Sequence, residues 1–379
     1  MNLRPIFAIF LPLIIVSVLA ACSGGDTITS APPVKLSACP TTPVTAPPPA
    51  LPASGPQVIQ ASTVAPSDTS TSTVISPNTA DQIQCGRVSV KTVSNVTYST
   101  PILADGTVKP LMLDISVPAG QGKRPLVIYI SGGGFLISTK EAALDQRTYI
   151  AEAGFVVASV QYRTVADQAT YRDTVGDVKA AIRYLRAHAD DYGIDTSQVA
   201  VWGESAGGYV AAMVGVSGKT TAFDSGGNLT QSSAVQAVID KFGPSDMSKI
   251  AADFDTATQT AYAAPGTAVA LFVNGATSTE GIVTDPTAHT TANPLTYVDA
   301  SDPPFLLLHG TADTYVSQSQ TLILHNALLG AGVSSKRYLL NGAEHGDLTM
   351  FGNPAAGLPW TTNQVMNIMV DFLKAKLNS

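Results

Sequence analysis

The 379-residue sequence is poor in charged residues, in cysteine and in clustered basic residues. Only 13% of the residues are charged and 45% are hydrophobic, which excludes a solvated disordered chain and allows a large buried core. The formal net charge is -7 and no run of five basic residues occurs, so no nucleic-acid partner is expected. The three cysteines form neither a Cys-x-x-Cys motif nor a His/Cys cluster, which argues against a structural zinc site.

The N-terminus predicts export. The apolar stretch Ile6–Leu19 is shorter than the ~20 residues of a transmembrane helix and has the proportions of a signal-peptide core. Residues 19–22 read Leu-Ala-Ala-Cys, which resembles a bacterial lipobox. The resemblance implies a signal peptide over residues 1–21 and acylation of Cys22, whereas an ordinary secretory cleavage site with Cys22 incidental is the alternative.

The expected location is therefore outside the cytoplasm. With an acylated Cys22 the protein would be a membrane-anchored lipoprotein that faces the periplasm or the cell exterior. Ser23 rather than Asp follows the cysteine, which resembles outer-membrane sorting if the bacterium is Gram-negative. Secretion without an anchor is the second prediction.

Residues 22–82 form a segment rich in Ser, Thr and Pro, with almost no aromatic residues. Such a composition buries too little apolar area to offset the entropy of ordering, so it predicts a disordered, semi-rigid tether. Cys39 lies in this segment and Cys85 just beyond it. In an oxidising compartment the two are expected to form a disulfide, and two free thiols are the alternative.

Residues 83–379 alternate predicted strands and helices. Strands are predicted at Leu111–Val117, Pro125–Ser131, Phe155–Tyr162, Gln198–Trp202, Val235–Phe242, Pro304–His309 and Ser335–Leu340. Helices are predicted at Tyr171–Asp190, Ser317–Ala331 and Asn363–Leu377. The alternation predicts an α/β fold with a mainly parallel, doubly wound sheet. Residues 248–294 break the rhythm, and we expect an insertion or lid near the carboxyl ends of the strands.

The pentapeptide Gly203-Glu204-Ser205-Ala206-Gly207 follows the predicted strand that ends at Trp202. A helix is predicted directly after it, and strand, tight turn and helix together are the context of a nucleophile elbow. Glycines on both sides of Ser205 leave room for the turn, which directs the hydroxyl above the sheet. The Ala206 N–H at the helix N-terminus is then a predicted oxyanion donor.

A nucleophilic serine needs a base, and five histidines are candidates. His345 lies between glycines in a loop after the last predicted strand, where a reachable base is expected. His309 ends a predicted buried strand and is interpreted as a packed core histidine. The others are His188, His289 and His325, which lie on a helix, in the insertion and on another helix.

The acid that orients the base is predicted to be Asp313, just after the strand that ends at His309. The chain order serine, aspartate, histidine is that of α/β-hydrolases. Asp285 and Asp302 are rivals, but the first lies in the insertion and the second precedes its strand. An ordinary turn residue is the alternative reading of Asp313.

Three glycines follow the predicted strand Pro125–Ser131. Consecutive glycines let backbone N–H groups approach a substrate oxygen closely, so Gly133 and Gly134 are predicted to complete the oxyanion hole with Ala206.

These motifs together resemble the α/β-hydrolase superfamily, and within it the esterase/lipase branch related to hormone-sensitive lipase and the feruloyl- and acetyl-esterase-like hydrolases. The residues that carry the resemblance are Ser131–Phe135, Val160–Arg163, Asp177–Arg186, Gly203–Gly208, His309–Asp313 and Glu344–Gly346. It implies a triad of Ser205, Asp313 and His345. It also implies that Tyr162 and Arg163 support the site. The family usually has His where Ser131 stands, a departure that concerns the rigidity of the glycine loop.

The predicted activity is hydrolysis of a carboxylic ester by a serine hydrolase through an acyl-enzyme, without metal or other cofactor. Short-chain acyl, acetyl or feruloyl esters, free or linked to a polysaccharide, are the expected substrates. A serine peptidase of the prolyl-oligopeptidase type is an alternative, although residues 23–82 cannot form the large N-terminal domain that such chains carry. A non-catalytic exported binding lipoprotein is the other alternative. The oligomeric state is not readable from the sequence.

Overall fold

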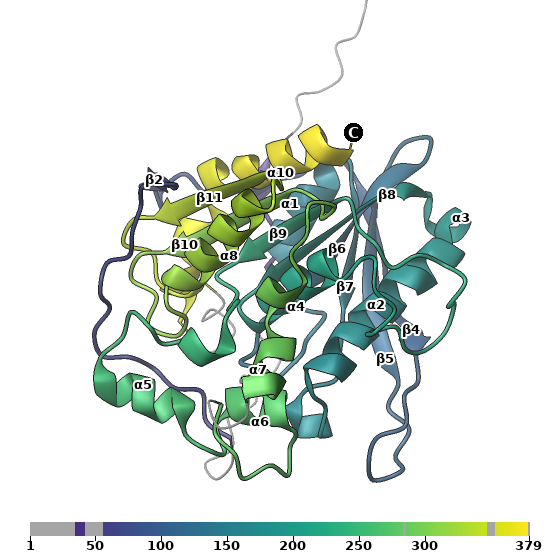
Figure 1. Cartoon of the computed structure of the whole chain (residues 1–379). Helices are drawn as coiled ribbons and strands as arrows, with labels where there is room; N and C mark the ends of the chain where they lie inside the picture. The colour runs from purple at the N-terminus through teal and green to yellow at the C-terminus, as the bar shows by residue number, and fades with distance from the viewer. Residues whose placement is uncertain (1–34, 42–55, 283–285, 347–352, 378–379) are drawn as a thin grey trace, which may run out of the picture. The chain divides into compact units, whose positions relative to one another are not determined.

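The computed structural model describes residues 35–41, 56–282, 286–346 and 353–377 (Figure 1). The strands are β1 (Ser37–Ala38), β2 (Thr73–Ile75), β3 (Gln84–Cys85), β4 (Val90–Ser99), β5 (Leu111–Pro118), β6 (Arg124–Ile130), β7 (Val156–Val160), β8 (Ile194–Glu204), β9 (Ala237–Lys241), β10 (Phe305–Gly310) and β11 (Ser335–Leu340). The α-helices are α1 (Leu144–Glu152), α2 (Tyr171–Ala187), α3 (Ala189–Tyr192), α4 (Ala206–Val216), α5 (Thr256–Ala263), α6 (Ala268–Asn274), α7 (Pro286–Ala292), α8 (Ser319–Gly330), α9 (Pro354–Gly357) and α10 (Asn363–Leu377). Short 3-10 helices are η1 (Val165–Asp167), η2 (Met247–Lys249), η3 (Pro294–Tyr297) and η5 (Leu358–Thr361).

A nine-stranded sheet runs through the molecule in the order β2-β11-β10-β9-β8-β6-β7-β5-β4. The strands from β2 to β7 in that order pair in parallel, and β4 and β5 are the antiparallel exceptions. β8 lies between β6 and β9, so its carboxyl end lies near the middle of the edge formed by the carboxyl ends of the parallel strands. The α/β prediction with a mostly parallel sheet is confirmed, as are all seven predicted strands within a few residues at each end.

Helices cover both faces of the sheet (Figure 1). Alternate residues of β8 belong to separate apolar clusters: Val199 and Val201 pack on the side of α2, α4 and α8, and Ala200 and Trp202 on the side of α1 and α10. All four are fully buried. Burial on both faces explains why these strands read as continuous apolar runs in the sequence.

Among the elements that the sequence analysis did not predict are β4 and α1. β4 is an edge strand whose side chains are largely exposed, so it lacks an apolar run. α1 carries Asp145, Gln146 and Arg147 in its first turn and has no apolar stripe at helical spacing. The predicted helix over residues 171–190 is divided at His188, where α2 ends and α3 begins.

The prediction of a disordered tether over residues 22–82 is wrong for residues 35–41, where β1 pairs with β3, and for residues 56–82. β2 pairs with β11 at the edge of the sheet, and Val64 bridges to Phe254. The backbone also donates a hydrogen bond from Ala61 N to Thr314 O at 2.8 Å. The composition wrongly predicted disorder because this segment buries little apolar area of its own. It is ordered by backbone hydrogen bonds to the folded domain. Residues 22–34 and 42–55, Cys22 included, lie outside the described residues.

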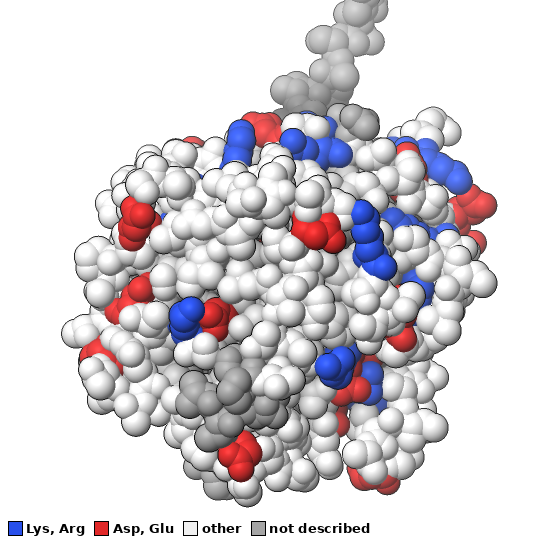
Figure 2. All heavy atoms as spheres, viewed as in Figure 1, with Lys and Arg blue, Asp and Glu red and all other residues white. Residues whose placement is uncertain are grey.

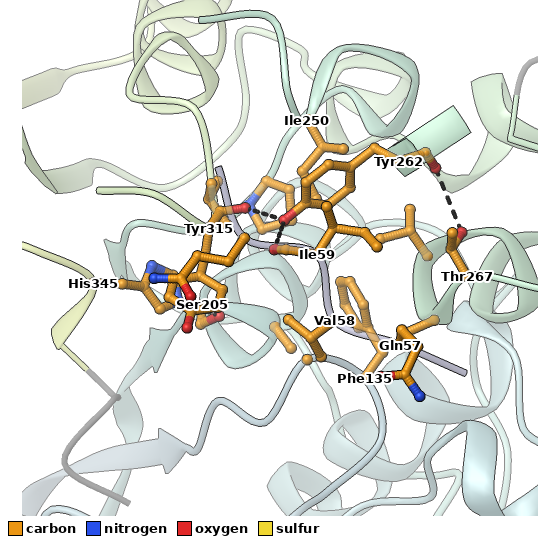
Figure 3. A pocket seen from close by; sticks show the side chains of 17 residues that line it. Gln57, Val58, Ile59, Phe135, Ser205, Ile250, Tyr262, Thr267, Tyr315 and His345 are labelled. Atoms are coloured by element: carbon orange, nitrogen blue, oxygen red, sulfur yellow. Dashed lines mark hydrogen bonds between the residues drawn. The ribbon is translucent and has the colours of Figure 1, made fainter. Parts of the chain in front are cut away.

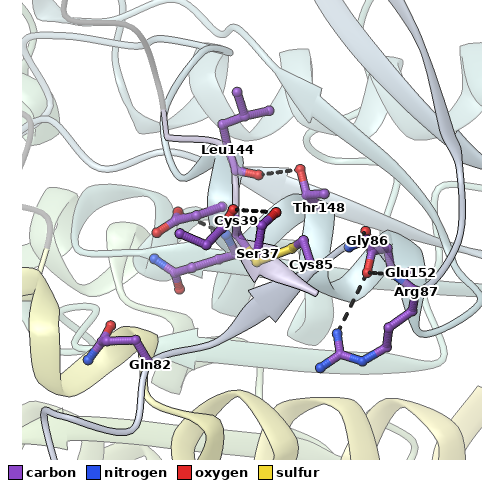
Figure 4. Close-up of a disulfide and its surroundings, with 12 residues drawn as sticks. Ser37, Cys39, Gln82, Cys85, Gly86, Arg87, Leu144, Thr148 and Glu152 are labelled. Carbon is purple, nitrogen blue, oxygen red and sulfur yellow. Dashed lines mark hydrogen bonds and ion pairs between the residues drawn. A yellow bond between two sulfur atoms is a disulfide. The ribbon is translucent and has the colours of Figure 1, made fainter. Parts of the chain in front are cut away.

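Cys39 and Cys85 are joined by a disulfide (Figure 4). It stands beside the antiparallel pair of β1 and β3, with a Cα–Cα distance of 4.7 Å. Next to it, the Glu152 carboxylate accepts hydrogen bonds from the backbone N–H groups of Gly86 and Arg87. The disulfide and the carboxylate thus fasten the N-terminal part of the chain to the end of α1.

The predicted insertion consists of short elements, η2 and α5 to α7, between β9 and β10. Its movement as a lid stays a prediction. The surface seen in Figure 2 has isolated acidic and basic side chains amid uncharged ones, so neither sign of charge dominates that face. Within the described ranges, no helix combines the length and the apolar character needed to cross a membrane.

Candidate active site

Ser205 stands at the turn between β8 and α4, as predicted. Its backbone has φ 55° and ψ -121°, a conformation that residues with a side chain rarely adopt and that costs ~1–3 kcal/mol. The turn is closed so tightly that a Cβ at Gly203 would lie 2.0 Å from the carbonyl oxygen of Gly207. The Ser205 N–H donates to the carbonyl of Lys241 on β9 at 2.9 Å, which anchors the turn to the neighbouring strand. The tight turn thus confines the serine to one position above the carboxyl edge of the sheet, where it is buried.

Three residues far apart in the sequence meet at this corner. His345 Nε2 lies 2.7 Å from Ser205 Oγ, and His345 Nδ1 lies 2.7 Å from Asp313 Oδ2. Asp313 follows β10 and His345 follows β11, so parallel strands deliver both to the edge at which β8 ends. This is the geometry in which an imidazole accepts the serine proton and a carboxylate fixes its tautomer.

The Asp313 carboxylate is fully buried and fully supplied with donors. Its Oδ1 accepts hydrogen bonds from the backbone N–H groups of Tyr315 and Val316. Its Oδ2 contacts His345 and, at 3.2 Å, the ring Nε2 of His309. Burial opposes ionisation, but the two histidines beside the carboxyl outweigh it and hold the pKa of Asp313 well below its usual range.

His309 is the residue whose part in the site the sequence analysis missed. The interpretation as a packed core histidine agrees with its complete burial at the end of β10. Its ring, however, also reaches Val316 O at 3.0 Å and Thr321 Oγ1 at 3.1 Å besides Asp313. The spacing of four residues between His309 and Asp313 across a turn was the available signal.

The glycine loop after β6 borders the same cavity as His345. Gly133 and Gly134 have φ of 136° and 59°, and Gly134 lines the same cavity as Ala206 and Ser205, whereas Gly133 does not. The loop is held at Ser131, whose Oγ accepts a hydrogen bond from the backbone N–H of Thr139 at 3.1 Å. The Ser131 carbonyl accepts from the Tyr162 hydroxyl at 2.6 Å. A serine therefore supports the loop at the position where the resembling family usually has histidine.

Arg163 supports the same loop indirectly, through its neighbour Tyr162. Its guanidinium forms a bidentate pair with Asp177, at 2.8 and 2.9 Å, and its backbone N–H donates to the same carboxylate. Both residues are largely buried. These contacts fix the chain around Tyr162, in line with the supporting role that the resemblance implied.

A cavity of about 220 Å³ opens beside the three residues (Figure 3). Most of the side chains that line it are apolar. They come from the glycine loop, the insertion, the loop after β10 and residues 57–60. The apolar side chains that line the cavity include Val58, Ile59, Phe135, Ile250, Val269 and Val316. In the part of the chain that the structure describes, no group of three or more His, Cys, Asp or Glu side chains is arranged to hold a metal ion.

The fold and this site together define an α/β-hydrolase: an elbow serine, an aspartate and a histidine at the carboxyl edge of a mostly parallel sheet. Comparison with known families agrees. Residues 113–328, more than half of the chain, match the BD-FAE family. The chain belongs to this family.

Curated relatives carry esterase names. The chain is 28% identical over 219 residues to "Esterase LipQ" of Mycobacterium tuberculosis, covering 57% of this chain and 49% of the relative. It is 27% identical over 259 residues to "Esterase LipC" of the same organism, covering 66% and 60% respectively. The chain thus spans about half to three fifths of the length of these relatives.

Solved structures agree with the fold. A "truncated form of carbohydrate esterase from gut microbiota" superposes with a TM-score of 0.63 at 25% identity, covering 80% of this chain and all of that one. The apo form of Thermogutta terrifontis esterase 2 gives a TM-score of 0.55 at 23% identity, covering 76% of this chain and 94% of that one. The second likeness concerns the fold alone.

Proposed function

We propose that this protein is a serine carboxylesterase that hydrolyses esters of short acyl groups, with acetyl and feruloyl esters as candidates, through an acyl-enzyme. The main support is the pair of 2.7 Å contacts that links Ser205 through His345 to Asp313. The esterase names of the relatives and the carbohydrate esterase among the structural neighbours add to it.

In the proposed reaction Ser205 Oγ attacks the ester carbonyl carbon while His345 Nε2 takes the serine proton. In this proposal the oxygen on which negative charge develops is held by the backbone N–H groups of Gly134 and Ala206, two residues that line the cavity beside Ser205. Collapse of the tetrahedral intermediate breaks the bond to the alcohol oxygen, which leaves with the proton from His345. Water then attacks the acyl-enzyme by the same route and releases the acid. Asp313 stays ionised and stabilises the imidazolium that forms in both halves.

Hydrolysis by the full chain is the direct test. We expect turnover of p-nitrophenyl acetate to fall by ~10⁴-fold or more in Ser205→Ala. Ser217→Ala is the matched control, because Ser217 is also buried but lies at the far end of α4. An activated phosphonate should label a single peptide that contains Ser205. Equal turnover in wild type and Ser205→Ala would refute the proposal.

We further propose that the chain is exported, with Cys22 as the acylated anchor. The signal-like residues 1–21 and the lipobox-like residues 19–22 support this. The disulfide between Cys39 and Cys85 is of a kind that persists in oxidising compartments. Metabolic labelling with a radioactive fatty acid, lost in Cys22→Ala, is the expected result, and unlabelled membrane-free protein would contradict it.

A further inference from the structure

We propose that the segment Gln57–Gln60, called the strap below, forms one wall of the acyl pocket and limits the length of the acyl group that the enzyme accepts. The proposal rests on the proposed esterase function and extends it to the acyl group. The strap lies more than fifty residues before the first predicted strand of the catalytic domain, in the region that the sequence assigned to a tether. Figure 3 shows it crossing the cavity beside Ser205 and His345.

The strap is fastened to the loop that carries the acid. The Tyr262 hydroxyl lies 2.6 Å from the carbonyl oxygen of Ile59 and 2.6 Å from that of Tyr315, two residues after Asp313 (Figure 3). Just beyond the strap, the backbone N–H of Ala61 donates to Thr314 O at 2.8 Å. The strap is therefore held by the insertion and by the aspartate loop at once.

At its other side the strap touches the oxyanion loop. A Cβ built at Gly134 would lie 2.6 Å from Val58 Cγ2, so the glycine backbone and the valine methyl group are in direct contact. Gly134 also has φ 59°, which favours glycine. Val58 thus lies next to the place where the carbonyl oxygen of an ester must sit.

The position of the cavity and its apolar lining indicate which part of the ester enters it. The reacting carbonyl has to touch Ser205 Oγ and the N–H groups of Gly134 and Ala206, and these three residues line the cavity. Of the two groups bonded to that carbonyl carbon, the acyl chain and the alkoxy group, one then lies between Val58 and Ile59 on one side and the insertion on the other. An apolar wall disfavours a hydroxyl-rich sugar, since buried polar groups without partners are costly. The acyl chain therefore enters and the alcohol stays outside.

The strap limits the length of that acyl group. Val58 and Ile59 line the cavity beside Gly134, so an acyl chain that grows from the reacting carbonyl meets them. The hydrogen bonds of Tyr262 to Ile59 and Tyr315 hold the strap in place against a longer chain.

Two ester series measured on the full chain test the proposal. In the first, the acyl group of p-nitrophenyl esters grows from acetate through butanoate to octanoate. In the second, the acyl group stays acetyl and the alcohol grows. Wild type is expected to prefer acetate over octanoate and to tolerate long alcohols.

Val58→Ala and Ile59→Ala should each raise the octanoate-to-acetate ratio of kcat/KM by about tenfold or more, since a few methylene groups in a pocket give discrimination of this size. Val58→Ile should lower the ratio of butanoate to acetate. Val74→Ala, an exposed valine on β2, is the matched control and should leave both ratios unchanged. Thermal unfolding by circular dichroism verifies that each variant is folded.

The outcomes separate the strap from the activity. If wild type hydrolyses acetate but the acyl ratios of all three strap variants stay within twofold of wild type, the strap does not limit the pocket. A shift confined to the alcohol series would also overturn the assignment of the acyl group. If wild type hydrolyses no ester, the proposed function itself fails.

Discussion

Two aspartates are fully buried at neighbouring strands: Asp240 lies on β9 and Asp313 just after β10. The pKa values of their carboxyls are shifted in opposite directions. Asp313 accepts two backbone N–H groups and contacts two histidines, and its pKa lies well below the usual range. Asp240 accepts one hydrogen bond, from Gly243 N at 2.8 Å, and its Oδ2 has no partner among the described residues. Burial raises the pKa of Asp240 to about 7 against that single bond.

The contrast shows that depth alone does not prepare a carboxyl for catalysis. In a low-dielectric interior, donors decide whether the charged form survives. Asp313 has donors on both oxygens and faces His345, so it can hold an imidazolium. Asp240, with a single donor, keeps its proton to near neutral pH and forms no hydrogen bond to Ser205 or His345.

The sharpest test of this comparison is Asp313→Asn. The amide keeps the shape but removes the charge and favours the wrong tautomer of His345, so kcat should fall by ~10⁴-fold. Steady-state hydrolysis of p-nitrophenyl acetate measures it. Asp302→Asn is the control, because Asp302 was one of the two rivals in the sequence and is only half-buried. The other rival, Asp285, lies outside the described residues. Loss of activity in Asp302→Asn, or its retention in Asp313→Asn, would reverse the assignment.

Asp240→Asn tests the raised pKa of Asp240 through the pH dependence of the free energy of unfolding. The pKa of Asp240 is about 7 when folded and ~3.9 when unfolded, so between these values the folded state binds more protons. Wild type therefore loses stability as the pH rises from 4 to 7, by about 4 kcal/mol from this group. Asparagine cannot ionise, so the variant lacks this loss.

Urea unfolding at pH 4 to 8 should show a stability difference, variant minus wild type, that grows by about 4 kcal/mol up to pH 7 and then levels off. Asp302→Asn, whose pKa is raised to about 6, should give a smaller gain that ends at lower pH. A difference for Asp240→Asn that does not change with pH would show that this carboxyl is ionised throughout.

The smallest expected effect concerns the second histidine on Asp313. His309→Leu removes a hydrogen bond to a charged group, worth ~1.5–3 kcal/mol, so kcat should fall about ten- to a hundredfold while KM changes little. His309→Gln, which retains a donor, should recover part of the loss. This split identifies a positioning residue, because a general loss of structure would not spare KM.

His325→Leu is the matched control for this substitution. His325 is nearly as buried and has hydrogen-bond partners on both ring nitrogens, Thr71 O and Ser335 Oγ, but it lies away from the site. Its replacement should leave kcat unchanged. Equal losses in His309→Leu and His325→Leu would mean that both act through folding alone.

The α/β alternation, the elbow at Ser205 and the loop position of His345 were predictable because local sequence carries them. Buried parallel strands read as apolar runs, and a tight turn demands glycine at fixed spacing. The sequence also selected Asp313 over Asp302 through its place after a strand. It could not show that Asp313 and Asp240 differ in ionisation, since that depends on donors brought in by other strands.

By itself the sequence determined the fold class, the family resemblance, the predicted export signal and the three residues now found in contact. Only the tertiary structure decided that His309 joins Asp313 and that residues 57–60 line the cavity. The physical reason is range. Periodicity and turn chemistry act over a few residues, whereas a carboxyl's donors and a pocket's walls are assembled from segments hundreds of residues apart.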